Sequence, residues 1–389
     1  MKHLGDITKI NGYEAPSVDV IIGGSPCQDL SAAGKRAGLQ GDRSGLFMEQ
    51  IRIIKEMREA SANNGAAEIR PRYMVWENVP GAFSTNGGED FRAVLEETVR
   101  IVDKDAVIPR PAGGKWRNSG CIVGDGFTVA WRVFDAQFWG VPQRRRRIAL
   151  VADFGGETAP EILFERKGMQ RGIEESGKER KRAAVDSETD IREAVFDISQ
   201  RRDGVRCYKN ISPTISALAG TGGNNVPLCF GVDTYNQCET GAVCYAVGNG
   251  QVQQTGLHKV AGALNCMHDQ QSVINRYGVR RLTPLECERL QGFPDGWTDI
   301  GEWVDNKGKK HESSDAARYK ALGNSIALPP WRWVLKRLSG NYSRRATMAS
   351  LFDGIGGFPL IWEEINGKGS CLWASEIEEF AVAVTKKRI

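Results

Sequence analysis

A cysteine and a glutamate each follow an apolar run that is typical of a buried strand. Cys27 comes shortly after the run Val18–Ile22. Glu77 comes directly after the run Arg72–Trp76. Loops at the carboxyl edge of a parallel sheet are where α/β enzymes place reactive groups, so we expect the two side chains to meet there. A thiolate can act as a nucleophile and a carboxyl group can share a proton with a ring nitrogen, although each residue alone is more often structural.

Four consecutive arginines precede a further apolar run. They lie in Gln143–Arg147, which leads into Ile148–Val151. Because alternate residues of a strand share a face, we expect Arg145 and Arg147 to point the same way. The pair could bind an anion or a carbonyl oxygen. The alternative is a solvated basic edge.

A glycine-rich turn lies near the other end of the chain. Phe352–Gly357 follows the short run Ala349–Leu351 and precedes a helix-like stretch, 358–365. Glycines at such a turn let the backbone approach a nucleotide cofactor, and an acidic residue about 20 positions later binds the ribose hydroxyls. Glu376 lies 19 positions after Gly357. The spacing predicts a nucleotide-cofactor site on this strand and turn.

Apolar runs alternate with helical patterns along the first 150 residues. Strands are expected at 18–22, 72–76, 127–134 and 147–152, and helices at 46–57 and 91–102. This alternation predicts an α/β fold, with a mostly parallel sheet covered by helices on both faces.

The composition changes after Asp153. Residues 165–182 are dominated by charges of both signs, which favours a solvated helix or linker over a segment that grips DNA. Residues 201–272 are rich in Gly, Asn, Gln and Thr, which indicates loop-rich β structure with short strands around 229–232 and 243–247. Such loops suit contacts with base edges and phosphates. A small domain without a ligand is the alternative.

The overall composition narrows the classes of protein. The sequence of 389 residues has no apolar stretch of about 18–20 residues and no signal-peptide core at its start, so we expect a cytoplasmic protein. Its nine cysteines include no C-x-x-C pair, which predicts neither a metal site nor a disulfide framework. The net charge of +4 permits a polyanionic partner.

Taken together, the motifs resemble those of the DNA cytosine-5 methyltransferase family, in particular the bacterial and phage modification enzymes. The likeness covers nearly the whole chain, and the middle matches least. The segments that carry it are Phe352–Gly357, Glu376, Asp6, Pro26–Gln28, Glu77–Val79, Gln143 with Arg145 and Arg147, Arg280–Pro294 and Gly323–Ser325.

The order of the motifs departs from that of the family. The glycine motif usually comes first, whereas here it comes last. We therefore expect a circular permutant whose two chain ends lie close together, between the helix after Glu376 and the strand before Asp6. A truncated enzyme fused to the head of a second copy is the alternative.

The resemblance implies a Rossmann-like S-adenosylmethionine-dependent methyltransferase sheet with a smaller, loop-rich target-recognition domain. The implied parts are the main catalytic part (1–152), the target-recognition region with its charged linker (153–276), the late motifs (277–338), a linker (339–347) and the permuted cofactor segment (348–389).

The implied reaction is methyl transfer from S-adenosyl-L-methionine to carbon 5 of a cytosine flipped out of duplex DNA. Cys27 would add to carbon 6, and Glu77 would hydrogen-bond ring nitrogen 3. Arg147, supported by Arg145, would hold the carbonyl oxygen of the base. The residues implied for the cofactor are Phe352, Asp353, Gly354, Ile355, Gly356, Gly357, Glu376, Ile377, Asp6, Ile7, Pro26, Leu46, Asn324 and Ser325.

Double-stranded DNA is the implied partner, with a cognate restriction endonuclease acting separately, no membrane and a monomeric chain. An inactive DNA-binding relative and an RNA cytosine methyltransferase are the alternatives. No residue of the sequence reveals which bases are read.

Overall fold

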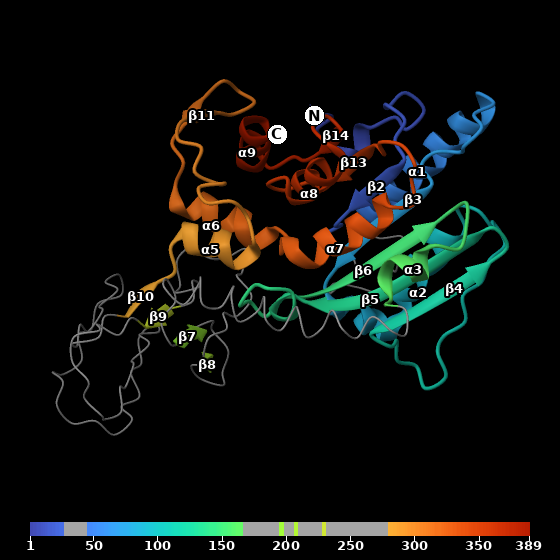
Figure 1. The fold of residues 1–389 in the computed structure, drawn as a ribbon, viewed down its shortest axis with the longest axis horizontal. Coiled ribbons are helices and arrows are strands. Elements are labelled where there is room, and N and C mark those ends of the chain that lie inside the picture. Colours follow the sequence, from blue (N-terminus) through green and yellow to red (C-terminus); the bar gives the residue numbers. More distant parts are fainter. Residues whose placement is uncertain (27–44, 166–193, 198–205, 209–227, 231–278) are drawn as a thin grey trace.

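An eight-stranded sheet organises the chain (Figure 1). The computed structural model describes residues 1–26, 45–165, 194–197, 206–208, 228–230 and 279–389. In sheet order, the strands are β1 (Lys2–His3), β14 (Cys371–Ser375), β13 (Met348–Leu351), β2 (Val20–Gly23), β3 (Tyr73–Asn78), β6 (Arg146–Asp153), β5 (Phe127–Asp135) and β4 (Ser119–Gly124).

The sheet is parallel at one end and antiparallel at the other. Strands β1, β14, β13, β2 and β3 are parallel to one another, whereas β6, β5 and β4 each pair antiparallel with the preceding strand in the order. The strands predicted at 18–22, 72–76, 127–134 and 147–152 are confirmed as β2, β3, β5 and β6. Strand β4 was not predicted, because its half-exposed edge position gives no continuous apolar run.

Helices cover both faces of the sheet, which confirms the predicted α/β layering. The helices are α1 (Gly45–Asn63), α2 (Glu89–Val99), α3 (Ala159–Leu163), α5 (Pro284–Gln291), α6 (Asp315–Asn324), α7 (Leu328–Ser339), α8 (Gly357–Asn366) and α9 (Glu379–Arg388). On β2, Val20 and Ile22 pack into one core cluster with side chains of α3, α7, α8 and α9. Ile21, on the opposite face, packs into a second cluster with α1 and α2.

Two smaller sheets complete the described structure. One has the order β10-β9-β7-β8, formed by Val279–Arg281, Leu228–Phe230, Ala194–Asp197 and Arg206–Tyr208. The other pairs β11 (Trp303–Val304) with β12 (Lys310–His311). The predicted strand near 229–232 overlaps β9, while the one near 243–247 and nearly all of the charged stretch lie outside the described residues.

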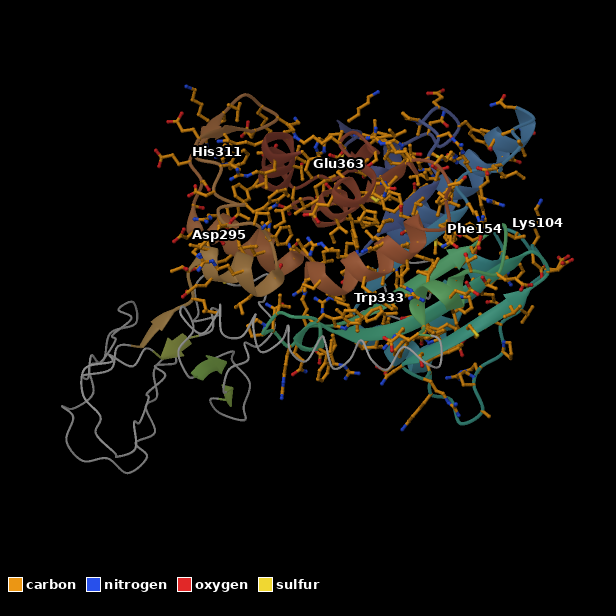
Figure 2. The ribbon with its side chains drawn as sticks, viewed as in Figure 1. Lys104, Phe154, Asp295, His311, Trp333 and Glu363 are labelled. Carbon is orange, nitrogen blue, oxygen red and sulfur yellow. The ribbon has the colours of Figure 1, made fainter. Side chains whose placement is uncertain are left out.

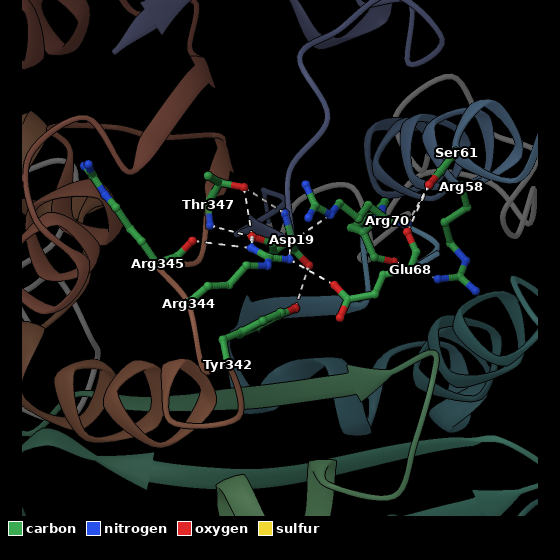
Figure 3. A network of polar contacts seen from close by, with 10 residues as sticks. Asp19, Arg58, Ser61, Glu68, Arg70, Tyr342, Arg344, Arg345 and Thr347 are labelled. Atoms are coloured by element: carbon green, nitrogen blue, oxygen red, sulfur yellow. Dashed lines mark hydrogen bonds and ion pairs between the residues drawn. The ribbon is translucent and has the colours of Figure 1, made fainter. Parts of the chain in front are cut away.

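A buried carboxylate anchors the segment that joins α7 to β13 (Figure 3). Asp19 is 1% exposed and accepts hydrogen bonds from Arg344 Nη1 and Nη2 at 2.7 and 2.6 Å and from the Thr347 amide at 2.8 Å. Arg70 Nε lies 3.1 Å from the same carboxylate. Asp19 precedes β2 and Thr347 precedes β13, so this cluster fixes where the two central strands begin.

The two chain ends lie side by side (Figure 1). Strand β1 pairs in parallel with β14, and Thr385 Oγ1 of α9 lies 3.0 Å from His3 Nε2. This confirms the expected closeness of the ends. The strand before the glycine turn, β13, therefore occupies the middle of the sheet although it comes late in the chain.

Candidate active site at the carboxyl edge of the sheet

The described parts of several predicted motifs lie at the carboxyl edge of the five parallel strands. Leu351, the last residue of β13, is in register with Gly23 of β2 on one side and Ser375 of β14 on the other. Gly23 is in turn in register with Trp76 of β3. The strand order reverses between β13 and β2, and this is the position at which open α/β sheets bind ligands.

The glycine turn after β13 has a strained backbone. Phe352 has a φ of 55°, a conformation that costs a bulky residue about 1–3 kcal/mol and that clusters at functional sites. Gly354 has a φ of 56°, and a Cβ added to it would meet nothing within 4 Å. A Cβ on Gly356 would instead lie 2.8 Å from Thr385 and Ile389. One side of the turn therefore packs on α9, while Gly354 lies open for a ligand.

Glu376 completes this turn. Its Oε2 accepts the Gly354 amide at 2.7 Å, and its Oε1 accepts the amides of Ile377 and Glu378 at 2.7 and 2.8 Å. The carboxylate is thus fixed in position with lone pairs left for hydroxyl donors. Ile377, beside it, is 70% exposed, which gives an apolar side chain at the edge of the turn.

Asp6 follows the end of β1 by three residues, at the same edge of the sheet. Its carboxylate accepts from the amide and the hydroxyl of Thr8 at 3.0 and 2.9 Å, and these bonds lower its pKa. Ile7 is buried in the core cluster that contains α1 and α2, and Leu46 at the start of α1 packs against that cluster. The open turn and the carboxyl groups of Glu376 and Asp6 fit the backbone, ribose and amino contacts that an adenosine cofactor requires.

Asp353 is a buried acid within the glycine turn. It is 5% exposed, and the Ser350 hydroxyl donates to its Oδ1 at 2.6 Å. Burial raises the pKa of Asp353 to about 8, the bond from Ser350 opposes the rise, and the nearby charge of Glu376 adds to it. The side chain is therefore largely protonated at neutral pH.

Glu77 and Arg147 form an ion pair where β3 and β6 meet. Arg147 Nε lies 2.8 Å from Glu77 Oε1, with 17% and 13% of the two side chains exposed. A Cβ on Gly24 would come within 2.9 Å of Glu77 Oε2, so a larger residue at that position would displace the Glu77 carboxyl group. The pair offers a carboxylate and a guanidinium to one ligand, the combination that recognises neighbouring acceptor and donor atoms of a base edge.

The segment that leads to Cys27 is held by the strand of Glu77. The Trp76 indole donates to Ser25 Oγ at 3.0 Å, and Asn78 Nδ2 donates to the Ser25 carbonyl at 3.1 Å. Pro26 is exposed and is the last described residue before Cys27, which itself lies outside the described residues. The anchoring role of Ser25 was not predicted, and its position beside a proline and a cysteine gave no signal for it.

Arg145 and Arg147 diverge in their contacts. Arg145 is 3% exposed and donates to the carbonyls of Gly323, at 3.1 Å, and Ser325. Burial lowers the pKa of Arg145, the charge of Arg147 acts in the same direction, and Glu77 opposes both. Arg145 thus holds the end of α6, where Asn324 is exposed and Ser325 is buried, next to the Glu77–Arg147 pair.

A tryptophan from the late part of the chain also supports the glycine turn. Trp297 Nε1 donates to the Ile355 carbonyl at 2.8 Å.

Within the described ranges, no three His, Cys, Asp or Glu side chains are grouped where they could share a metal ion. Among the helices of those ranges, none has both the length and the apolar character that a membrane crossing requires.

Several known proteins are similar to this chain. It is 28% identical over 427 residues to the DNA N-6-adenine-methyltransferase of Escherichia phage P1, a match that covers 87% of this chain and 55% of that protein. It is 26% identical over 345 residues to the Type II methyltransferase M1.ScrFI of Lactococcus lactis subsp. cremoris, covering 86% and 65%. The chain therefore spans less than two thirds of the length of these two relatives.

A solved structure and a protein family also match. The Dnmt2 methyltransferase of S. pombe aligns over 86% of this chain and 82% of its own, at 14% identity and a TM-score of 0.43, which is too low to identify a shared fold. The model of the family described as C-5 cytosine-specific DNA methylase matches residues 1–100 and 123–340, and so stops before β13. By this match over most of its length, the chain belongs to the C-5 cytosine-specific DNA methylase family.

Proposed function

We propose that this chain transfers the methyl group of S-adenosyl-L-methionine to carbon 5 of a cytosine in duplex DNA. The observation that carries the proposal is the Glu77–Arg147 ion pair, which lies beside the Ser25–Pro26 stem of Cys27 at the edge that also holds the glycine turn. Membership of the C-5 cytosine-specific DNA methylase family supports it.

The side chains have complementary roles in this proposal. The Cys27 thiolate adds to carbon 6 of the ring, which raises the electron density at carbon 5. The Glu77 carboxyl group shares a proton with ring nitrogen 3, which offsets the negative charge that develops on the ring, while Arg147 holds the carbonyl oxygen. Arg145 acts through the 323–325 backbone that it fixes. After carbon 5 has gained the methyl group, it loses its proton to solvent, which re-forms the double bond between carbons 5 and 6 and expels Cys27 as the thiolate.

The cofactor site is proposed around the turn after β13. The open backbone at Gly354 would receive the cofactor, Glu376 would accept the ribose hydroxyls, and Asp6 would accept the adenine amino group. The exposed Ile377 side chain would cover the adenine ring. S-adenosyl-L-methionine supplies an electrophilic methyl group on its sulfonium. The target base must be flipped out of the duplex to reach it, at a cost of about a few kcal/mol.

The name of the phage P1 relative raises adenine as a second target. The exocyclic amine of adenine carries its own lone pair and requires no covalent activation by a thiol. Carbon 5 of cytosine is a poor nucleophile and does require it. A Pro-Cys-Gln sequence whose stem, Ser25, is bonded to Trp76 and Asn78 on either side of Glu77 therefore favours cytosine. Identification of the methylated base by mass spectrometry separates the two targets.

A covalent trap tests the proposal. In the presence of S-adenosyl-L-methionine, the full chain should form a covalent adduct with duplex DNA that contains 5-fluorocytosine in place of cytosine, and the adduct should map to Cys27. The adduct persists because the fluorine on carbon 5 cannot leave as a proton does, so Cys27 is not expelled. Cys27→Ser should form no adduct and no 5-methylcytosine, yet should bind the cofactor normally. Cys121→Ser, which changes an exposed cysteine on β4, is the matched control and should behave as wild type.

Glu77→Gln gives an independent measurement. It should lower kcat by about 10²–10⁴-fold, the usual contribution of a positioned acid or base. Undiminished 5-methylcytosine formation by Cys27→Ser would refute the nucleophile, and full turnover by Glu77→Gln would refute the role of the carboxylate.

The biological setting follows from the same proposal. We propose a specific duplex sequence as the substrate, methylated by a monomer that protects DNA in restriction–modification, with any endonuclease acting separately. Parallel assays on duplex DNA and transfer RNA test the nucleic acid. Binding of DNA without methyl transfer would instead indicate an inactive DNA-binding relative.

A further inference from the structure

A short turn between α5 and α6 links the late part of the chain to the glycine turn. It spans residues 296–300, and Figure 2 shows Asp295, which immediately precedes it. Trp297 in this turn is buried, and the centroid of its ring lies 5.8 Å from that of Phe293. The indole N–H donates to the Ile355 carbonyl. The mechanism proposed above uses neither Trp297 nor the charged residues around its turn.

A buried carboxylate holds one side of the 296–300 turn. Glu288 on α5 accepts the Gly296 amide at 2.7 Å and the Thr298 amide at 2.8 Å. The Thr298 hydroxyl donates to the same carboxylate. Arg318 of α6 lies 3.4 Å from Glu288 and supplies the opposite charge. Because the two amides lie on either side of Trp297, the carboxylate fixes the backbone of that residue.

Two cations at the end of α9 hold the other side of the 296–300 turn. Arg388 Nε donates to the Trp297 carbonyl at 2.9 Å, and its Nη2 donates to two further carbonyls of the turn. Lys387 Nζ donates to the Ile300 carbonyl at 2.5 Å. An acid therefore binds the amides of this turn while two basic residues bind its carbonyls, and the indole between them has a fixed direction.

The glycine turn needs support of this kind. Phe352 has a φ of 55°, and strained backbone persists only where the surrounding structure holds it. Helix α9 also reaches the glycine turn directly, since a Cβ on Gly356 would lie 2.8 Å from Thr385. Gly354 remains open. Trp297 and α9 thus hold one half of the glycine turn and leave the other half for a ligand.

We propose that Trp297 is a positioning residue for S-adenosyl-L-methionine. Glu288 and Arg388 direct its indole to the Ile355 carbonyl, and this bond keeps the glycine turn in the conformation that receives the cofactor. A turn that is ordered in advance loses less conformational entropy on binding, so the affinity for the ligand is higher. The inference rests on the proposed function. It concerns the affinity for the cofactor and leaves the chemistry at the target base unchanged.

Cofactor binding by Trp297→Phe tests this role. Phenylalanine keeps an apolar ring beside Phe293 and removes the N–H donor. The Kd for S-adenosyl-L-methionine, measured by calorimetry with the full chain and without DNA, should rise about 3- to 10-fold, the net contribution of one hydrogen bond. The kcat at saturating cofactor should stay within about twofold of wild type, because the lost contact acts only on binding. An unchanged Kd, or a fall in kcat as large as the rise in Kd, would overturn the proposal.

Variants of Arg388 test whether the arginine acts through Trp297. Arg388→Met should weaken cofactor binding, and Trp297→Phe/Arg388→Met should bind no more weakly than Trp297→Phe alone. Additive losses would show that α9 acts only through its packing on Gly356, which would refute the role of Trp297. Arg388→Lys keeps a donor for the carbonyls and should recover part of the affinity. Lys386→Met removes an exposed cation from the same end of α9, and this matched control should keep the wild-type Kd.

The results separate this inference from the proposed function. If wild type binds no S-adenosyl-L-methionine, the proposed methyl transfer fails and the role of Trp297 fails with it. If wild type binds the cofactor and the variants bind it equally well, only the role of Trp297 fails. Arg388 is exposed, so its replacement keeps the test decisive if Trp297→Phe does not fold. A wild-type Kd in Arg388→Met would then refute the inference.

Discussion

Replacing Asp19 by asparagine should lower the free energy of unfolding by about 2–4 kcal/mol. The buried carboxylate accepts two hydrogen bonds from Arg344 and two from Thr347, and the carboxamide oxygen can keep only part of this set. Charge-assisted bonds contribute about 1.5–3 kcal/mol each and are not additive. Arg344 and Arg70 are 38% and 35% exposed, so water can solvate them, and the loss stays below the upper limit for a fully buried pair.

Urea unfolding of Asp19→Asn and of a control measures this loss. The control is Glu378→Gln, which breaks the ion pair between Lys320 and Glu378, whose side chains are 47% and 56% exposed. An exposed pair of this kind contributes at most about 1 kcal/mol. If Asp19→Asn costs no more than Glu378→Gln, the cluster around Asp19 does not anchor the starts of β2 and β13.

The pH dependence of the same difference gives a second check. Burial alone would raise the pKa of Asp19, but the bonds from Arg344 and Thr347 and the charge of Arg70 lower it overall. A carboxyl group with a lowered folded-state pKa contributes stability above its unfolded-state pKa of about 3.9, and this stability is lost as the pH falls through the folded-state value. The difference between wild type and Asp19→Asn should therefore be constant near neutrality and shrink in acid.

Further variants test the glycine turn. The pKa of Asp353 is raised to about 8, so the stability that its buried carboxyl group contributes is greatest below the unfolded-state pKa and is lost as the pH rises toward 8. The asparagine in Asp353→Asn cannot ionise. The unfolding free energy of this variant should therefore vary less over this pH range than that of wild type. Gly354→Ala should cost only about 1–2 kcal/mol for its positive φ, yet should weaken S-adenosyl-L-methionine binding measured by calorimetry. Gly356→Ala also meets Thr385 and Ile389 at 2.8 Å, so it should lower the melting temperature more than Gly354→Ala does; equal melting temperatures would contradict this difference.

Much of the parallel half of the sheet was predictable from the sequence. Strands buried on both faces, such as Val20–Gly23 and Tyr73–Asn78, give continuous apolar runs, and the charged or glycine-rich residues after them mark the carboxyl edge. The capping box of Thr283 and Glu286 at the start of α5 is likewise a local signal, because a Thr followed three residues later by a Glu is typical of a helix N-terminus. The antiparallel half was less evident, because the edge strand β4 alternates between exposed and half-buried residues.

The contacts within the site were less predictable than its composition. The pattern at 145 and 147 indicated a shared face, but it did not indicate that Arg145 would bind the 323–325 backbone, some 180 positions away. The bond from Trp297 to the Ile355 carbonyl and the cluster around Asp19 also join distant parts of the chain. Such contacts depend on how the elements pack, which the local sequence does not encode.

The central position of β13 has a consequence for synthesis on the ribosome. The partner strand β2 is synthesised more than 300 residues before β13, and the pairing of the two strands begins with Val20 opposite Met348. Until the later segment emerges, the nascent chain carries an apolar strand with one unpaired edge, a template for association with other chains. We therefore expect the nascent polypeptide to rely on chaperones. At high protein concentration, we expect exchange of the 348–389 segments between two copies to be the main form of misassembly.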